Sequence, residues 1–68
     1  MITDIDIWRA AKQLVDQHGP DAATEAAMMA DRFGADGNFW AQRVWLRIMQ
    51  AIEWLQDLSG RDPLELEH

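Results

Sequence analysis

The sequence contains no cysteine, so disulfide bonds and thiolate metal sites are excluded as supports for the fold. Support is needed, because a domain of about 60 residues buries only about 60% of the surface that its unfolded chain exposes. This chain has 68 residues. Domains of such length are otherwise stabilised by a metal, by very regular helix packing or by a partner subunit. We expect regular helix packing and association with a partner subunit here.

Basic residues are also scarce: 6 lysines and arginines stand against 12 acidic residues, which gives a formal net charge of −6. A surface of this sign repels phosphate groups, so non-specific binding to nucleic acids is not expected. No apolar run approaches the roughly 18 residues that a membrane span requires. The first residues, MITDIDIW, lack the basic region of a signal peptide. We therefore predict a cytoplasmic protein with no membrane partner.

What the sequence does contain is a helical pattern of apolar residues, punctuated by glycine and proline. The pattern predicts a single all-α domain over residues 1–60, with three helices at about 4–18, 20–34 and 37–59. No segment alternates with the two-residue period of a strand, so we expect no sheet.

The end of the chain is predicted to stand outside this domain. Residues 61–68 follow Gly60 and contain Pro63, which disfavours a helical conformation in the residue before it, so we expect a mobile tail. The final Leu66-Glu67-His68 is typical of a vector-derived tag remnant and is left out of the fold prediction.

The first helix has clear signals at both ends. Thr3 is a good N-cap, and Asp6 is placed to complete a carboxylate variant of the capping box. Ile2 and Ile7 occupy the two positions of a hydrophobic staple around this cap. Gly19 is predicted to end the helix with a left-handed conformation. At about 100° per residue, the apolar arc of this helix contains Ile7, Trp8, Ala10, Ala11, Leu14, Val15 and His18.

The second helix is predicted to begin at Pro20, whose missing N–H is not needed in a first turn. Its body is rich in alanine, the best helix former. Met28 is expected to point away from the apolar face. That face consists of Ala22, Ala23, Ala26, Ala27, Met29, Ala30 and Phe33. Such small side chains let a neighbouring helix approach closely.

The third helix, with Asp36 as its expected N-cap and Gly60 at its end, has an unusually wide apolar face. Its central stripe contains Ala41, Val44, Ile48, Ala51, Ile52 and Leu55. One flank adds Trp40, Trp54 and Leu58, and the other adds Trp45 and Met49. The apolar arc therefore covers more than half of the helix, whereas an ordinary surface helix has a stripe of about 100°.

Two interpretations explain this width, and they are compatible. The third helix can be central, with the first helix on one side and the second on the other. Alternatively, one flank stays uncovered after the three helices pack and forms a contact surface. We predict a helical homodimer with Trp40, Trp45, Met49 and Trp54 as interface residues. Arg47 lies between Trp40 and Trp54 on the helical wheel, where its guanidinium can stack on an indole or remain solvated.

Catalytic chemistry is not indicated. His18, Asp21 and Glu25 are possible metal ligands, but Gly19 and Pro20 interrupt the helix between them, and a structural role for His18 is favoured. The single serine, Ser59, lies at a helix end, Thr3 and Thr24 have no marked base, and no glycine-rich phosphate loop is present. We expect no catalytic residue, no cofactor and no metal site. The predicted function is therefore a non-catalytic interaction or structural module.

Two other functions stay open. A small DNA-binding regulator of helix-turn-helix type would use Arg43 and Arg47 as part of a basic solvent face. A small-ligand-binding helical module would have a pocket with converging polar groups near His18.

The chain also resembles a group of short, uncharacterised helical proteins of alphaproteobacteria over most of residues 4–55. The matching features are Asp4 and Asp6 ahead of Trp8, His18-Gly19, Ala26-Ala27-Met28, Ala30-Asp31, and then Trp45, Ile48, Ile52 and Leu55. The Phe39-Trp40 pair departs from the pattern of the group. The resemblance implies a helical fold, and it implies no catalytic residue, cofactor or substrate.

Overall fold

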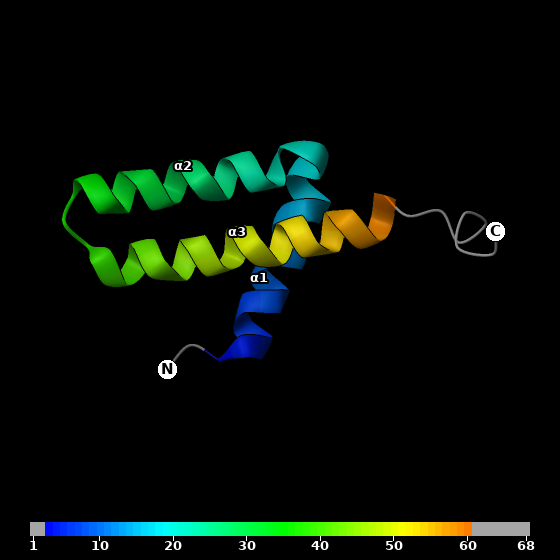
Figure 1. Ribbon diagram of the computed structural model, residues 1–68, viewed down its shortest axis with the longest axis horizontal. Helices are drawn as coiled ribbons and strands as arrows, with labels where there is room; N and C mark the ends of the chain where they lie inside the picture. Colours follow the sequence, from blue (N-terminus) through cyan, green and yellow to red (C-terminus); the bar gives the residue numbers. More distant parts are fainter. Residues whose placement is uncertain (1–2, 61–68) are drawn as a thin grey trace.

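The computed structural model describes residues 3–60, which form helices and, within this range, no strand (Figure 1). The elements are α1 (Asp4–His18), the 3-10 turn η1 (Gly19–Asp21), α2 (Ala22–Ala35) and α3 (Phe39–Gly60). The predicted all-α class is confirmed. The predicted tail over 61–68 and the predicted staple residue Ile2 lie outside the described residues.

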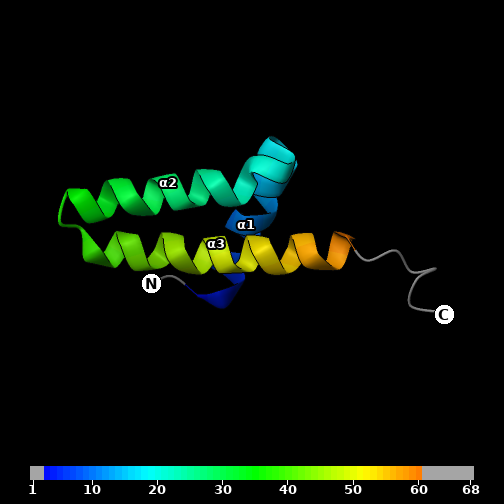
Figure 2. The ribbon, with the colours of Figure 1, turned by 45° about the horizontal axis from the view of Figure 1, so that its top comes forward.

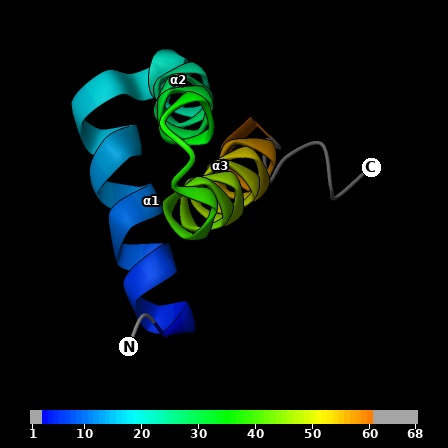
Figure 3. The ribbon, with the colours of Figure 1, turned by 90° about the vertical axis from the view of Figure 1, so that its left-hand side faces the viewer.

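The helices are arranged as a hairpin with a third helix packed across it. α2 and α3 run antiparallel and side by side, while α1 crosses α3 at the end of the hairpin where α2 begins (Figures 1 and 2). Figure 3 looks along the hairpin and shows α1 beside both α2 and α3. The other end of the hairpin, around the α2–α3 turn, has no α1 beside it. α3 is therefore the central helix, and α1 covers part of its length.

The N-terminus of α1 is closed by a capping box, as predicted. The Thr3 hydroxyl accepts a hydrogen bond from the Asp6 backbone N–H, and the Asp6 carboxylate accepts one from the Thr3 backbone N–H. The backbone and side-chain hydrogen bonds from Thr3 lower the pKa of Asp6, with a smaller contribution from the nearby Arg9. These bonds satisfy donors that the first turn of a helix leaves without partners.

The end of α1 and the start of α2 meet at a tight corner. Gly19 has a φ of +57°, which favours glycine, and its N–H donates to the carbonyl of Val15. Pro20 follows within η1, so α2 begins at Ala22 rather than at the predicted Pro20. The side chain of Gln56 on α3 donates to the Gly19 carbonyl at 3.0 Å. One corner of the molecule is therefore held by a contact from the opposite end of the chain.

The turn between α2 and α3 corrects the predicted cap. Asp36 lies at the C-terminal end of α2, and Gly37 follows with a φ of +79°. Asn38 caps α3, because its Oδ1 accepts a hydrogen bond from the Ala41 N–H at 3.2 Å. Asp36 was the wrong choice because two further residues are needed to complete the turn. The helix accordingly starts at Phe39.

The buried core is built mainly from alanine. Three alanines at four-residue intervals along α2 are buried, and Ile52 on α3 is the largest side chain with almost no exposure. Among residues 3–58, the buried ones are Ile7, Ala11, Ala22, Ala26, Ala30, Ala41, Ile48, Ala51 and Ile52. Six of these nine residues are alanines. The helices therefore approach closely, and the core buries few large apolar side chains.

Candidate functional site

Large apolar side chains remain on the surface of this small fold. The exposed ones are Ile5, Trp8, Met28, Phe39, Trp40, Leu46, Trp54 and Leu58. Single exposed apolar residues are normal in proteins, whereas several that lie together mark a contact surface. Their distribution over the helices therefore decides what they mean.

Three residues of α3 form a row that we call the tryptophan stripe: Trp40, Arg47 and Trp54. They are seven residues apart, and seven residues fall only about 20° short of two helical turns, so they lie on one side of α3. Trp40 is 65% exposed and Trp54 is 54% exposed. Val44, Ala51 and Leu58 run beside the stripe with the same spacing. The stripe is therefore an apolar row with one cation at its centre.

The N-terminal part of α1 meets the stripe at two points. The indole of Trp8 packs edge-on against the indole of Trp54, with ring centroids 5.2 Å apart and planes inclined at 68°. The Asp4 carboxylate accepts a charge-assisted hydrogen bond from the Arg47 guanidinium at 2.6 Å. Both partners of this ion pair are largely exposed, so its contribution to stability is small. It does fix the position of the guanidinium beside α1.

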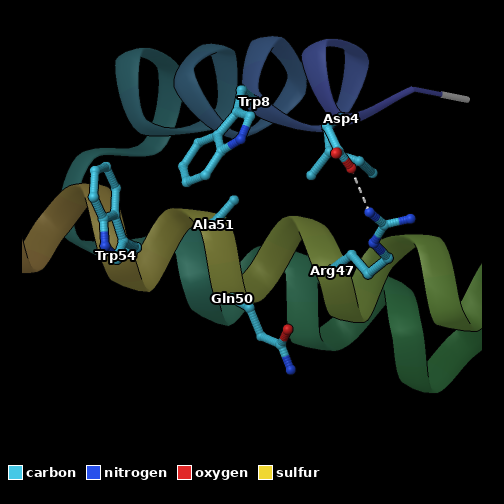
Figure 4. Close-up of a pocket in the computed structure, with 7 residues that line it drawn as sticks. Asp4, Trp8, Arg47, Gln50, Ala51 and Trp54 are labelled. Carbon is cyan, nitrogen blue, oxygen red and sulfur yellow. Dashed lines mark hydrogen bonds and ion pairs between the residues drawn. The ribbon is translucent and has the colours of Figure 1, made fainter.

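A groove lies between these two contacts. It has a volume of about 320 Å³ and is lined by Asp4, Ile7, Trp8, Arg47, Gln50, Ala51 and Trp54. Figure 4 shows the side chains of Trp8 and Asp4 directed toward α3, with the indole pair at one end and the ion pair at the other. We call this space the α1–α3 groove. Its lining combines four apolar side chains with one carboxylate, one guanidinium and one amide, and it includes no hydroxyl, thiol or imidazole.

The four predicted interface residues fall into two groups. Trp40 and Trp54 belong to the exposed tryptophan stripe. Trp45 and Met49 are half-buried and pack against the core cluster on the other side of α3. The role of all four as interface residues stays a prediction.

Trp8 is more exposed than the pattern of apolar residues predicts. The helical wheel put it on the buried arc of α1, but it is 41% exposed. It lies about 100° from the buried Ile7, at the edge of that arc, where coverage depends on how far the neighbouring helix extends. The sequence signal for this exposure is a bulky aromatic residue at the margin of an apolar arc.

His18 is exposed, although the wheel placed it on the buried arc of α1. It is the last residue of α1. A helical wheel gives the direction of a side chain around the helix, but it does not show whether a neighbouring helix extends far enough to cover that side chain. His18 does not line the α1–α3 groove. Among residues 3–60, no group of three or more histidine, aspartate or glutamate side chains is placed to hold a metal ion.

The two arginines considered for DNA binding differ in their surroundings. Both Arg43 and Arg47 are exposed on α3. Arg47 is paired with the Asp4 carboxylate. Within the described part of the chain, the helices are too short or too polar to span a bilayer.

No protein-family model matches this chain, and neither does any curated protein or solved structure. The resemblance to short alphaproteobacterial proteins therefore stays a prediction. The functional argument depends on the chain's own surface.

Proposed function

We propose that this protein is a non-catalytic interaction module that associates with a second copy of itself through the tryptophan stripe. The observation that carries the proposal is the exposure of Trp40 and Trp54, each by more than half, on the same side of one helix. Tryptophan is enriched at the centres of protein interfaces, because it combines a large apolar area with one N–H donor.

The area of this surface supports association. From their exposed fractions and an area of about 250 Å² for a tryptophan, Trp8, Trp40 and Trp54 together expose roughly 400 Å². A typical stable interface covers about 800 Å² on each partner. The three indoles would therefore supply about half of such an interface, and Leu58, beside the stripe, adds further exposed apolar area.

The composition of the core supports the same proposal. A chain of 68 residues without disulfides has few ways to gain stability, and the buried residues are mostly alanines. Burying large side chains between two copies adds the apolar contact that the single chain lacks. Association and stability are therefore coupled, and the melting temperature should rise with protein concentration.

The test is the molar mass in solution over a series of protein concentrations. We expect the mass to rise from that of the 7.8 kDa chain to twice this value. Trp40→Glu should raise the dissociation constant of the dimer by about 100-fold or more, since each dimer loses the contact twice. Met28→Glu changes a similarly exposed side chain on α2 and serves as the control. A chain that stays monomeric at the highest concentration overturns the proposal.

A further inference from the structure

Trp40 and Trp54 are placed symmetrically about Arg47, with seven residues on each side. Each tryptophan therefore lies about 10 Å from Arg47 along the helix axis. If two copies of α3 pack antiparallel around a two-fold axis near Arg47, Trp40 of each copy lies opposite Trp54 of the other. A two-fold contact of this kind is self-complementary, so it forms twice in one dimer.

The α1–α3 groove lies at the place where this arrangement brings the second indole. The groove is bounded by Trp54 and Ala51 of α3 and by Trp8 of α1. Its volume of about 320 Å³ is at the lower end of the range for ligand pockets, roughly 300–1,000 Å³. The Asp4 carboxylate lines the same groove and supplies an acceptor for an indole N–H. The groove is therefore large enough to admit one aromatic side chain, and its apolar lining with one acceptor suits an indole.

Trp40 is the side chain of this protein best placed to enter such a groove. Among the described residues it is the most exposed large apolar one, at 65%, and it lies near the end of the hairpin that α1 does not cover. The groove and Trp40 lie on the same side of α3 at different heights. This arrangement lets one two-fold axis satisfy both contacts at once, so the assembly closes as a dimer and does not extend into a filament.

We infer that Trp40 of each copy docks in the α1–α3 groove of its partner, against the partner's Trp8 and Trp54. This inference rests on the proposed self-association and specifies its register. The two Arg47 side chains approach each other near the axis, and each is already neutralised by its own Asp4 at 2.6 Å. Removing that compensation through Asp4→Asn should weaken the dimer by about tenfold, more strongly at low salt than at high salt.

Complementation between two variants tests the register. Trp40→Glu and Trp54→Lys should each be monomeric at a concentration where the unchanged chain is dimeric. In an equimolar mixture, one contact of the heterodimer keeps both indoles, and the other pairs Glu with Lys. We expect the mixture to form dimers with a dissociation constant at least about tenfold lower than that of either variant alone. If Trp40 instead meets the partner's Trp40, mixing restores nothing.

Cross-linking provides a second readout that does not change either tryptophan. Because the chain has no cysteine, one introduced thiol reports on one position. In the register inferred here, the Asp4→Asn/Arg47→Cys double variant should form a disulfide-linked dimer under mild oxidation. Glu53→Cys, on an exposed position of α3 away from the stripe, should not. The cross-linking experiment tests the register even if circular dichroism shows that Trp54→Lys does not fold.

The outcomes separate the two proposals. A monomeric unchanged chain overturns both the dimer and its register. A dimeric chain that shows neither complementation nor cross-linking at position 47 overturns the docking of Trp40 and leaves self-association standing. Restored dimerisation in the mixture, or selective cross-linking at position 47, supports the docking of Trp40 in the groove.

Discussion

Gln56 of α3 donates a hydrogen bond from its side-chain Nε2 to the backbone carbonyl oxygen of Gly19, at 3.0 Å. The two residues are 37 positions apart in the sequence. The same oxygen also accepts from the N–H of Ala22, so it serves the first turn of α2 as well as the contact with α3. This carbonyl is where the corner between α1 and α2 is attached to the central helix.

Replacing Gln56 by leucine should therefore loosen this corner. We expect Gln56→Leu to lower the free energy of unfolding by about 0.5–1 kcal/mol, in the lower part of the range for a hydrogen bond, because Ala22 still donates to the oxygen. Gln13→Leu makes the same change at an exposed position of α1 and is the control. Urea unfolding followed by circular dichroism at one protein concentration measures both. Equal effects of the two substitutions would show that the contact does not stabilise the fold.

The Asp6 cap predicts a specific dependence on pH. Its pKa is lowered in the folded chain, first by the backbone hydrogen bond from Thr3 and then by the Thr3 hydroxyl. A lowered pKa means that the ionised group stabilises the fold above the unfolded value of about 3.8, and that this stabilisation is lost as the pH falls through the folded pKa. Asp6→Ala should be less stable than the unchanged chain at pH 7, and the difference should shrink below about pH 4.

The measurement is the free energy of unfolding between pH 7 and about pH 2.5, a range that includes the titration of an aspartate. Asp16→Ala removes an exposed carboxylate from the same helix and reports the general effect of one negative charge. If the difference caused by Asp6→Ala is the same at both ends of this range, the cap does not depend on the ionised carboxylate.

The start of α3 offers a direct comparison of two candidate caps. Asn38→Ala removes the acceptor for the Ala41 N–H and should lower the free energy of unfolding by about 1 kcal/mol. Asp36→Ala changes the residue that the sequence pattern had favoured, and it should change the free energy by less than about 0.5 kcal/mol. Thermal unfolding of both variants at equal concentration checks the order. If Asp36→Ala lowers the free energy of unfolding more than Asn38→Ala does, Asp36 is the cap of α3.

Local features of this chain could be read from the sequence, because the interacting groups are close in the chain. The Thr3–Asp6 capping box depends on a spacing of three residues, and the glycine at position 19 ends α1 as predicted. The exposure of Met28 follows from its angle on the helical wheel. The cap of α3 was missed because Asp36 and Asn38 are both good capping residues, and the geometry of the turn decides between them.

The candidate site could be predicted only in part, because it depends on where α1 crosses α3. The wheel placed Trp40 and Trp54 on one flank, and both are exposed there. The helical wheel gives no position along the helix axis, so it could not predict the contacts of Trp8 with Trp54 and of Asp4 with Arg47. The α1–α3 groove is a product of that crossing. Contacts between helices depend on corners such as Gly19, whose direction the sequence does not specify.

The last prediction concerns the alanines that set the distance between α2 and α3. Ala26 is fully buried in the core cluster, so Ala26→Leu would add three carbon atoms where the two helices are in close contact. We expect a loss of about 1–3 kcal/mol in the free energy of unfolding, because overpacking forces side chains off their preferred rotamers.

Ala35→Leu adds the same atoms at an exposed position of α2 and should have little effect. A stabilising effect of Ala26→Leu would mean that the helices separate readily enough for the core to accept larger side chains, so that the single chain could gain apolar contact without a partner. Destabilisation at position 26 alone would instead show that the interior cannot accept larger side chains. Further apolar contact must then be made on the outside of the chain, where Trp40 and Trp54 are exposed.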